Sequence, residues 1–195
     1  MARPKEFDEE RALAAALELF WEKGYEAASV QDLTERMGIQ KASLYNTFGD
    51  KHALFVRALS AYSTETLEWY RVLLERPGPT RVILADLFRE LTDGCGKDDD
   101  CRGCLCVNSA VELAPHDPAI AALIDRHNRS REELFRRALQ RGQASGEVPA
   151  DLDATATARF LLNVIAGLDV ARKGGPRQSE LDDVVRVALS VLDRH

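Results

Sequence analysis

The chain has 195 residues, of which 45% are hydrophobic and 30% are charged, and its formal net charge is −6 at pH 7. This length and apolar content suffice to bury a substantial core, in one domain or in two small ones. The acidic balance excludes indiscriminate binding of nucleic acid over the whole surface. We find no secretory signal and no apolar run of about 18 residues, so we expect a soluble cytoplasmic protein with no membrane partner.

The composition favours an all-α fold, because Ala, Leu, Arg and Glu dominate and runs of β-branched residues are few. The first expected helix runs from Asp8, a capping residue, to Gly24. The next begins at Ser29, where Asp32 completes a capping box, and ends at Gly38, which can adopt the left-handed conformation.

Another short helix follows almost at once. Its Leu44 and Phe48 lie one turn apart and face inward, so the polar residues around them face outward. Two helices joined so tightly need a further helix behind them, which favours a helix-turn-helix whose second helix enters the DNA major groove. Spacing alone leaves an ordinary helical hairpin equally open. The residues expected to face DNA are Ser29, Gln40, Lys41, Ser43, Tyr45, Asn46, Thr47, Lys51 and His52.

The rest of the chain is expected to be helical as well. Asp50 can cap a long helix that ends at about Glu75, before the prolines at positions 77 and 79. This gives about nine helices, of which the first three form a helix-turn-helix domain over residues 1–50 and the others a helical domain over 51–195. The remaining helices are expected at 81–92, 101–113 and 117–144, then from Asp151 or Asp153, and finally after the loop at 173–176.

The N-terminal third resembles the TetR family of bacterial transcriptional repressors, and its segments fall in the order and spacing of that family. Downstream the resemblance is to general architecture, although residues 103–110 resemble a segment of one branch of the family. The matching segments are Ala16-Leu17-Glu18-Leu19-Phe20, Lys23-Gly24-Tyr25, Ser29-Val30, Gly38-Ile39, Ser43-Leu44-Tyr45, Phe48-Gly49-Asp50-Lys51 and Ala53-Leu54-Phe55.

The resemblance implies a repressor that is not an enzyme, with no cofactor and no metal. It implies double-stranded operator DNA as partner, and release by a small-molecule effector bound in the domain at 51–195. A thiol-reactive signal is the alternative that the cysteines described below suggest. It also implies a homodimer through the last two helices, whose wide apolar faces could alternatively be intrachain core. A dimer can read a palindrome, because its two reading helices lie about 34–36 Å apart in successive major grooves.

The DNA-facing residues divide by chemistry. Tyr45 and Lys51 suit phosphate contacts, and His52 either contacts phosphate or only occupies the first helical turn. Asn can pair with adenine and Lys with guanine. Many relatives carry His in place of Asn46, so no base preference is carried over. The candidates for base reading are Gln40, Lys41, Ser43 and Asn46.

Cysteines are concentrated between positions 95 and 106, as Cys95, Cys101, Cys104 and Cys106. We expect Cys101 and Cys104 to share one face at a helix N-terminus, where the helix dipole favours the thiolate. One hypothesis is a redox or electrophile sensor in which Cys104 is modified or bridges a neighbour. A metal-responsive protein is a second, although the spacing matches no zinc finger. A third is that the cysteines are small structural residues.

Four further polar residues are candidates for an effector cavity between the middle helices, and they could equally be surface or core residues. They are Asn108, Glu112, His116 and His127. The alternative function is a thiol oxidoreductase that uses Cys101 and Cys104. The sequence disfavours it, because such chemistry is typical of a βαβ scaffold and no strand pattern is visible.

Overall fold

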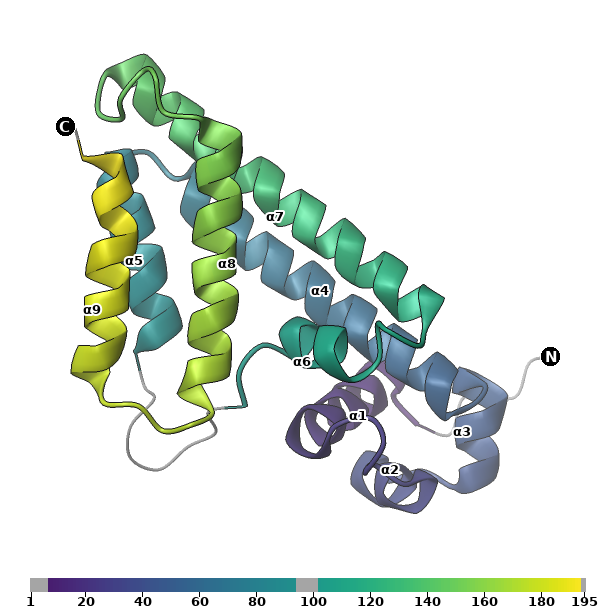
Figure 1. Cartoon of the computed structure of the whole chain (residues 1–195). Coiled ribbons are helices and arrows are strands. Elements are labelled where there is room, and N and C mark those ends of the chain that lie inside the picture. The colour runs from purple at the N-terminus through teal and green to yellow at the C-terminus, as the bar shows by residue number, and fades with distance from the viewer. Residues whose placement is uncertain (1–6, 94–101, 194–195) are drawn as a thin grey trace. The chain divides into compact units, whose positions relative to one another are not determined.

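A computed structural model describes residues 7–93 and 102–193 (Figure 1). Within these residues the chain forms nine α-helices and no strand, which confirms the predicted all-α fold. The helices are α1 (Glu9–Lys23), α2 (Val30–Met37), α3 (Lys41–Phe48), α4 (Lys51–Glu75), α5 (Thr80–Thr92), α6 (Leu105–Glu112), α7 (Pro118–Ser145), α8 (Ala154–Arg172) and α9 (Gln178–Leu189), followed by a 3₁₀ turn at Ser190–Leu192.

The helices gather into two compact units. Unit 1 comprises Met1–Thr64 and Asn108–Ile124, and unit 2 comprises Glu65–Val107 and Asp125–His195. The helices α4, α6 and α7 therefore each continue from one unit into the other. These units are defined by packing, whereas the domains at 1–50 and 51–195 are a prediction about function.

Local capping sets the start of the N-terminal helices as the sequence predicted. The Asp8 carboxylate accepts hydrogen bonds from the N–H groups of the first turn of α1. Ser29 and Asp32 form a reciprocal capping box at the start of α2. Gly38 ends α2 at φ 66°, a left-handed conformation that suits glycine because it has no Cβ.

Aromatic and aliphatic side chains form the core of unit 1. Leu33 of α2 and Leu44 of α3 are fully buried. The Phe20 ring of α1 meets the Phe55 ring of α4 edge to face, with centroids 4.9 Å apart, a favourable arrangement of aromatic quadrupoles. Burial of Leu44 and Phe48 fixes the inner face of α3 and so determines which of its residues remain outside.

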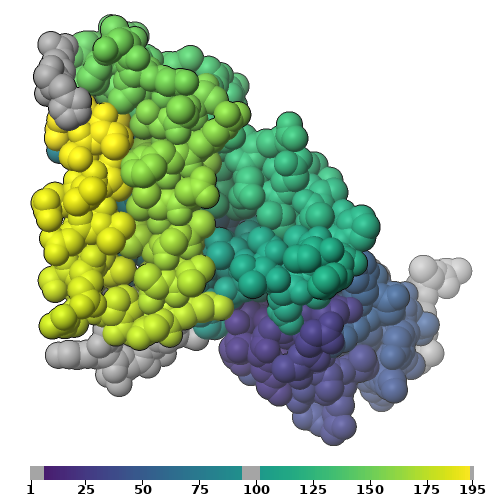
Figure 2. Space-filling model, viewed as in Figure 1, coloured from purple at the N-terminus to yellow at the C-terminus, as the bar shows by residue number. Residues whose placement is uncertain are grey.

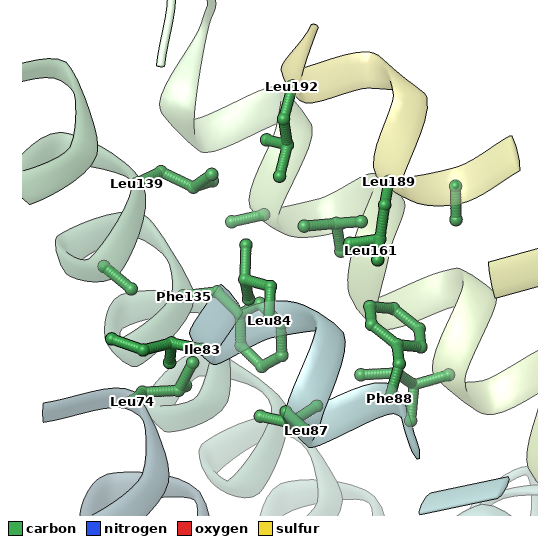
Figure 3. Close-up of a cluster of buried hydrophobic side chains, with 14 of the residues drawn as sticks. Leu74, Ile83, Leu84, Leu87, Phe88, Phe135, Leu139, Leu161, Leu189 and Leu192 are labelled. Atoms are coloured by element: carbon green, nitrogen blue, oxygen red, sulfur yellow. The ribbon is translucent and has the colours of Figure 1, made fainter. Parts of the chain in front are cut away.

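Unit 2 has a separate hydrophobic core between α4, α5, α7, α8 and α9 (Figure 3). Leu84 and Phe88 of α5, Phe135 of α7 and Leu161 of α8 are fully buried in it, and Leu189 of α9 packs against the same cluster. This core brings the inner faces of α7 and α8, which carry the polar groups described below, into one unit.

Two expectations from the sequence are corrected. The helix expected at residues 101–113 begins at Leu105, so Cys104 precedes the helix. Cys101, the other residue of the expected pair, lies outside the described residues. We also expected no apolar stretch of membrane length, yet α8 meets that criterion by length and composition alone. A core helix passes the same test, and Leu161, Ile165 and Leu168 of α8 are buried in unit 2.

Candidate nucleic-acid interface and buried cysteine cluster

The outer face of α3 is polar and open to solvent. Tyr45 is 44% exposed, Lys41 and Asn46 are exposed, and Ser43 and Thr47 are half-buried. All five are carried on a helix whose opposite face is buried through Leu44 and Phe48. The outward arrangement predicted from the sequence is therefore present, while the DNA contacts of these residues remain a prediction.

The N-terminus of α3 leaves main-chain donors without side-chain acceptors. Gln40 is exposed at the N-cap position, and its side chain makes no capping hydrogen bond. The first N–H groups of a helix have no partner within the helix, and their dipoles favour an anion. This end of α3 can therefore accept a DNA phosphate.

Three cations of unit 1 lie next to aromatic rings or carbonyl groups. Lys51 Nζ lies 4.4 Å from the centroid of the Tyr25 ring and 3.4 Å from the Glu26 carbonyl oxygen. Lys41 Nζ lies 6.0 Å from the Tyr45 ring centroid. Arg57 donates to the Thr47 carbonyl oxygen at 3.2 Å and covers the Phe48 ring. Arg57 was not among the DNA-facing residues predicted from the sequence. Its positive charge, two turns into α4, could have indicated it.

Other basic residues of unit 1 are neutralised by carboxylates. Arg36 donates two hydrogen bonds to Glu22, at 3.0 and 2.7 Å. Lys23 lies 3.0 Å from Asp32, whose pKa is lowered to about 2 by hydrogen bonds from Ser29 and then from Lys23. The Ser29 hydroxyl donates to the same carboxylate at 2.7 Å. In this structure Ser29 therefore caps α2, whereas its predicted contact with DNA is untested.

His52 faces a carboxylate. Its Nε2 lies 2.6 Å from Asp117 Oδ2, just before α7. Hydrogen bonds from the Ile120 N–H group and from His52 lower the pKa of Asp117. From the sequence, Asp117 is predicted only to begin a helix, because local patterns carry no information on its pairing with residue 52.

The candidate effector residues are divided between the two units. Asn108, Glu112 and His116 belong to unit 1, whereas His127 belongs to unit 2. Glu112 accepts hydrogen bonds from main-chain N–H groups in the α1–α2 connection, and His116 is exposed. Burial and the Arg131 charge lower the pKa of His127 to about 4, so His127 is neutral at pH 7.

Two of the cysteines lie in unit 2 as buried free thiols. Cys104 directly precedes α6, and Cys106 lies in its first turn. A hydrogen bond to Cys104, together with burial, raises the pKa of the Cys106 thiol. Cys106 therefore keeps its proton at pH 7. Cys95 and Cys101 lie outside the described residues.

The same region of unit 2 holds a buried guanidinium. Arg131 of α7 is 3% exposed, donates to the Tyr70 hydroxyl at 2.9 Å and lies 4.6 Å from the centroid of the Tyr70 ring. Burial lowers the pKa of Arg131, but the negative charges that Tyr70, Cys104 and Asp169 can carry raise it by more. The sequence did not single out Arg131 as a site residue, because α7 carries many other arginines.

Asp169 of α8 completes this cluster. Burial and the negative charge that Cys104 can carry raise its pKa from the ordinary value of 3.8 to about 7, against the opposing charge of Arg131. Gly103 brings the chain close to α8: at φ 65°, a Cβ there would lie 2.7 Å from the Asp169 carbonyl oxygen. Among the described residues no three His, Cys, Asp or Glu side chains are placed to hold a metal ion.

A tightly turned pair of short helices with a polar outer face on the second defines a helix-turn-helix protein. Residues 12–58 match the family model "Bacterial regulatory proteins, tetR family", and residues 78–186 match "Tetracyclin repressor-like, C-terminal domain". The chain therefore belongs to the TetR family of bacterial transcriptional regulators. This confirms the predicted class of TetR-type transcriptional repressor, which is not an enzyme.

Two curated transcriptional regulators match this chain over nearly its whole length. The HTH-type transcriptional regulator YezE of Bacillus subtilis (strain 168) is 37% identical over 194 residues, which cover 99% of this chain and 100% of YezE. The HTH-type transcriptional repressor ComR of Escherichia coli (strain K12) is 31% identical over 191 residues, covering 97% and 90%.

Solved structures of TetR family regulators have the same fold as this chain. A cysteine mutant of the TetR family transcriptional regulator CifR, complexed with 26bp double-strand operator DNA, has a TM-score of 0.86 at 36% identity, covering 98% of this chain and 100% of that chain. Members of the family are soluble, dimeric DNA-binding proteins. None of these comparisons supports the alternative of a thiol oxidoreductase or of a metal-responsive protein.

Proposed function

We propose that this repressor binds palindromic operator DNA as a cytoplasmic homodimer and is released by a small-molecule or thiol-reactive signal. The observation that carries the proposal is the outer face of α3, where Lys41, Tyr45 and Asn46 are exposed on a helix fixed from behind. Such a face offers donors and acceptors to base edges and exposes no bulky aliphatic residue.

The residues of this interface have different roles. Gln40, Lys41, Ser43 and Asn46 lie on or next to the first turns of α3 and would read bases, because the N-terminal part of a recognition helix contacts base edges. Tyr45 and Lys51 would contact phosphates, and Thr47 would support them at the end of α3. The first main-chain N–H groups of α3, which have no side-chain cap from Gln40, favour a DNA phosphate at the N-terminus of that helix. The complex of the similar CifR with its operator supports this mode of binding.

The experiment is selection of bound duplexes from a random pool by the purified full-length protein, followed by titration of the enriched duplex at several salt concentrations. We expect a two-fold symmetric sequence, and an affinity that falls steeply with salt because phosphate contacts release counterions. Selection of no sequence, or of an asymmetric one bound by a single subunit, would contradict the proposal.

The dimer is supported by exposed apolar residues on α8 and α9, which lie side by side along one face of unit 2 (Figure 2). Phe160 of α8 is 44% exposed, and Val187 of α9 is 57% exposed. Val170 and Val184 extend the same apolar character along the two helices. Apolar residues that recur on two neighbouring helices favour a helical interface between two copies.

The thiol-reactive signal would act on Cys104. Its sulfur accepts a hydrogen bond from Cys106 and lies near the Arg131 cation, and both features stabilise a thiolate. Mass mapping after iodoacetamide, in which the thiolate displaces iodide, should label Cys104 before Cys106. In a parallel assay the parent should lose operator affinity after peroxide, whereas Cys104→Ser should keep it. Release of both proteins alike would exclude Cys104 as the sensor, and protection by a chelator would favour the metal alternative.

A further inference from the structure

Arg131 is a buried cation with an unused hydrogen-bond donor. Its Nη2 donates to the Tyr70 hydroxyl at 2.9 Å, but its Nε has no hydrogen-bond partner among the described residues. A guanidinium offers five N–H donors, and a buried donor without an acceptor destabilises the folded chain. Such a group is expected where a ligand supplies the acceptor.

The countercharge of Arg131 is incomplete as well. Asp169 is the only carboxylate among the groups that act most strongly on it, and the two form no ion pair within the described part of the chain. The Tyr70 hydroxyl is a neutral acceptor at pH 7, because burial raises its pKa. Cys104 is the other group whose negative charge acts strongly on Arg131. The cluster therefore has an excess of positive charge when Asp169 and Cys104 are both protonated.

We propose that Arg131 anchors a binding site in unit 2 for a small organic carboxylate, which would be the effector of the repressor. A ligand oxygen would accept the hydrogen bond from Arg131 Nε, and its charge would complete the neutralisation of the guanidinium. Bonds between an ionised donor and an ionised acceptor are the stronger class of hydrogen bond. This inference rests on the proposed function only in naming the ligand as an effector.

A carboxylate fits better than a neutral or cationic ligand for electrostatic reasons. A cation would be repelled by Arg131, and a neutral amide would satisfy Nε but leave the buried charge uncompensated. A bound anion would also disfavour the ionised form of Asp169, so binding would be accompanied by proton uptake.

The groups that interact electrostatically with Asp169 come from several elements: Tyr70 of α4, Cys104 before α6, Cys106 of α6, Arg131 of α7 and Arg172 of α8. His127 of α7 interacts in turn with Arg131. His127 has lost its charge well below pH 7, and the Cys106 thiol keeps its proton above it. Asp169, with a pKa of about 7, is therefore the carboxyl group that links anion binding to pH near neutrality.

The experiment uses the full-length protein without DNA and isothermal titration with acetate, butyrate, octanoate and benzoate, each beside its uncharged amide. We expect at least one acid to bind about tenfold or more tightly than its amide at pH 6.5. Its affinity should fall by up to about tenfold for each pH unit above pH 7. Equal affinity of every acid and its amide, or no binding of any acid, would overturn the proposal.

Variants then test the residues. Arg131→Gln should weaken binding of the acid by about tenfold or more, whereas Arg137→Gln, an exposed arginine of the same helix that pairs with Glu133, should bind like the parent. Asp169→Asn should keep binding and lose its pH dependence. If Arg131→Gln fails to fold by circular dichroism, persistence of the pH dependence in Asp169→Asn would overturn the proposal.

Operator binding is measured separately on the ligand-free protein. Failure to bind a palindrome would contradict the proposed function and leave the acid affinities unaffected. An acid that binds at Arg131 but does not release the operator would show that the site is real and is not the effector site, which overturns that part of the inference.

Discussion

The side chain of Glu112 reaches the main chain of Tyr25, with Oε2 of the carboxylate 3.2 Å from the Tyr25 nitrogen across 87 positions of sequence. Its other oxygen accepts from the Glu26 N–H group at 3.0 Å. One carboxylate at the end of α6 therefore satisfies two donors in the connection between α1 and α2. Within unit 1 it holds α6 to the helices that support α3.

Glu112→Gln should loosen this connection, because an amide offers one acceptor oxygen and no charge. We expect the free energy of unfolding to fall by about 1–2 kcal/mol, and the Tyr25 and Glu26 amides to exchange hydrogen faster. Hydrogen-exchange mass spectrometry and urea unfolding would measure the two effects. The control is Glu35→Gln, because Glu35 is exposed and its carboxylate accepts a hydrogen bond from the surface side chain of Gln31, also on α2. Unchanged exchange at both amides in Glu112→Gln would show that the carboxylate is not needed there.

Lys51→Ala and Tyr45→Phe should weaken DNA binding at every sequence, since both residues are predicted to contact phosphate. Loss of one phosphate contact should lower the slope of log affinity against log salt by about one unit for Lys51→Ala. Fluorescence anisotropy with the selected operator and with a scrambled duplex would measure it. Because Lys51 also covers the Tyr25 ring, unfolding of the variant must be followed in parallel. Equal salt slopes for variant and parent would contradict the phosphate assignment.

Asn46→Ala should behave differently from Lys51→Ala. A residue that reads bases affects discrimination, so we expect a loss of about 1–3 kcal/mol on the selected operator and little change on the scrambled duplex. Competition titrations with operators changed one base pair at a time would locate the position read by Asn46. A uniform loss on both duplexes would assign Asn46 to the backbone instead.

Val187→Glu should convert the dimer to a monomer, because the symmetric interface would then bury two unpaired charges. We expect the dimer dissociation constant to rise by at least about tenfold, and operator affinity to fall with it. Analytical ultracentrifugation would measure the change. Val72→Glu is the matched control, because Val72 is equally open, at 59% exposed, but lies on α4. A dimer that survives in Val187→Glu and dissociates in Val72→Glu would place the interface elsewhere.

Asp169→Asn should change how stability depends on pH. The folded-state pKa of about 7 lies above the ordinary value of 3.8, so the folded parent binds this proton more tightly than the unfolded chain does. The parent therefore loses stability as the pH rises from about 4 to about 7, by at most about 4 kcal/mol. The variant should lack this loss, which urea unfolding between pH 4 and pH 8 would measure. Parallel pH profiles for parent and variant would contradict the raised pKa.

The sequence allowed prediction of those features that depend on neighbouring residues. The caps at Asp8 and Ser29 and the end of α2 at Gly38 follow from local hydrogen bonding and backbone conformation, and the inward position of Leu44 follows from helical periodicity. The N-terminal boundary of α6 was wrong by about a turn, because the residues before Leu105 pack against α8 and do not continue the helix.

Long-range polar contacts could not be predicted in this way. Glu112 was one of the candidates for an effector cavity, and its main-chain partners in the α1–α2 connection depend on the packing of α6 against the N-terminal helices. Arg131 is one of several arginines in α7, and only its position facing Tyr70 distinguishes it from the exposed ones. Side-chain identity gives the chemistry of such groups, whereas their partners depend on tertiary structure.

Gly103 has a consequence for how this repressor can evolve. Any side chain at this position would collide with the carbonyl oxygen of Asp169 and would push the cysteine segment away from the end of α8. Selection for altered inducibility should therefore recover substitutions at this single codon. Such variants should respond to a changed range of signals and still regulate the same promoters, because none of the residues predicted to face DNA is altered.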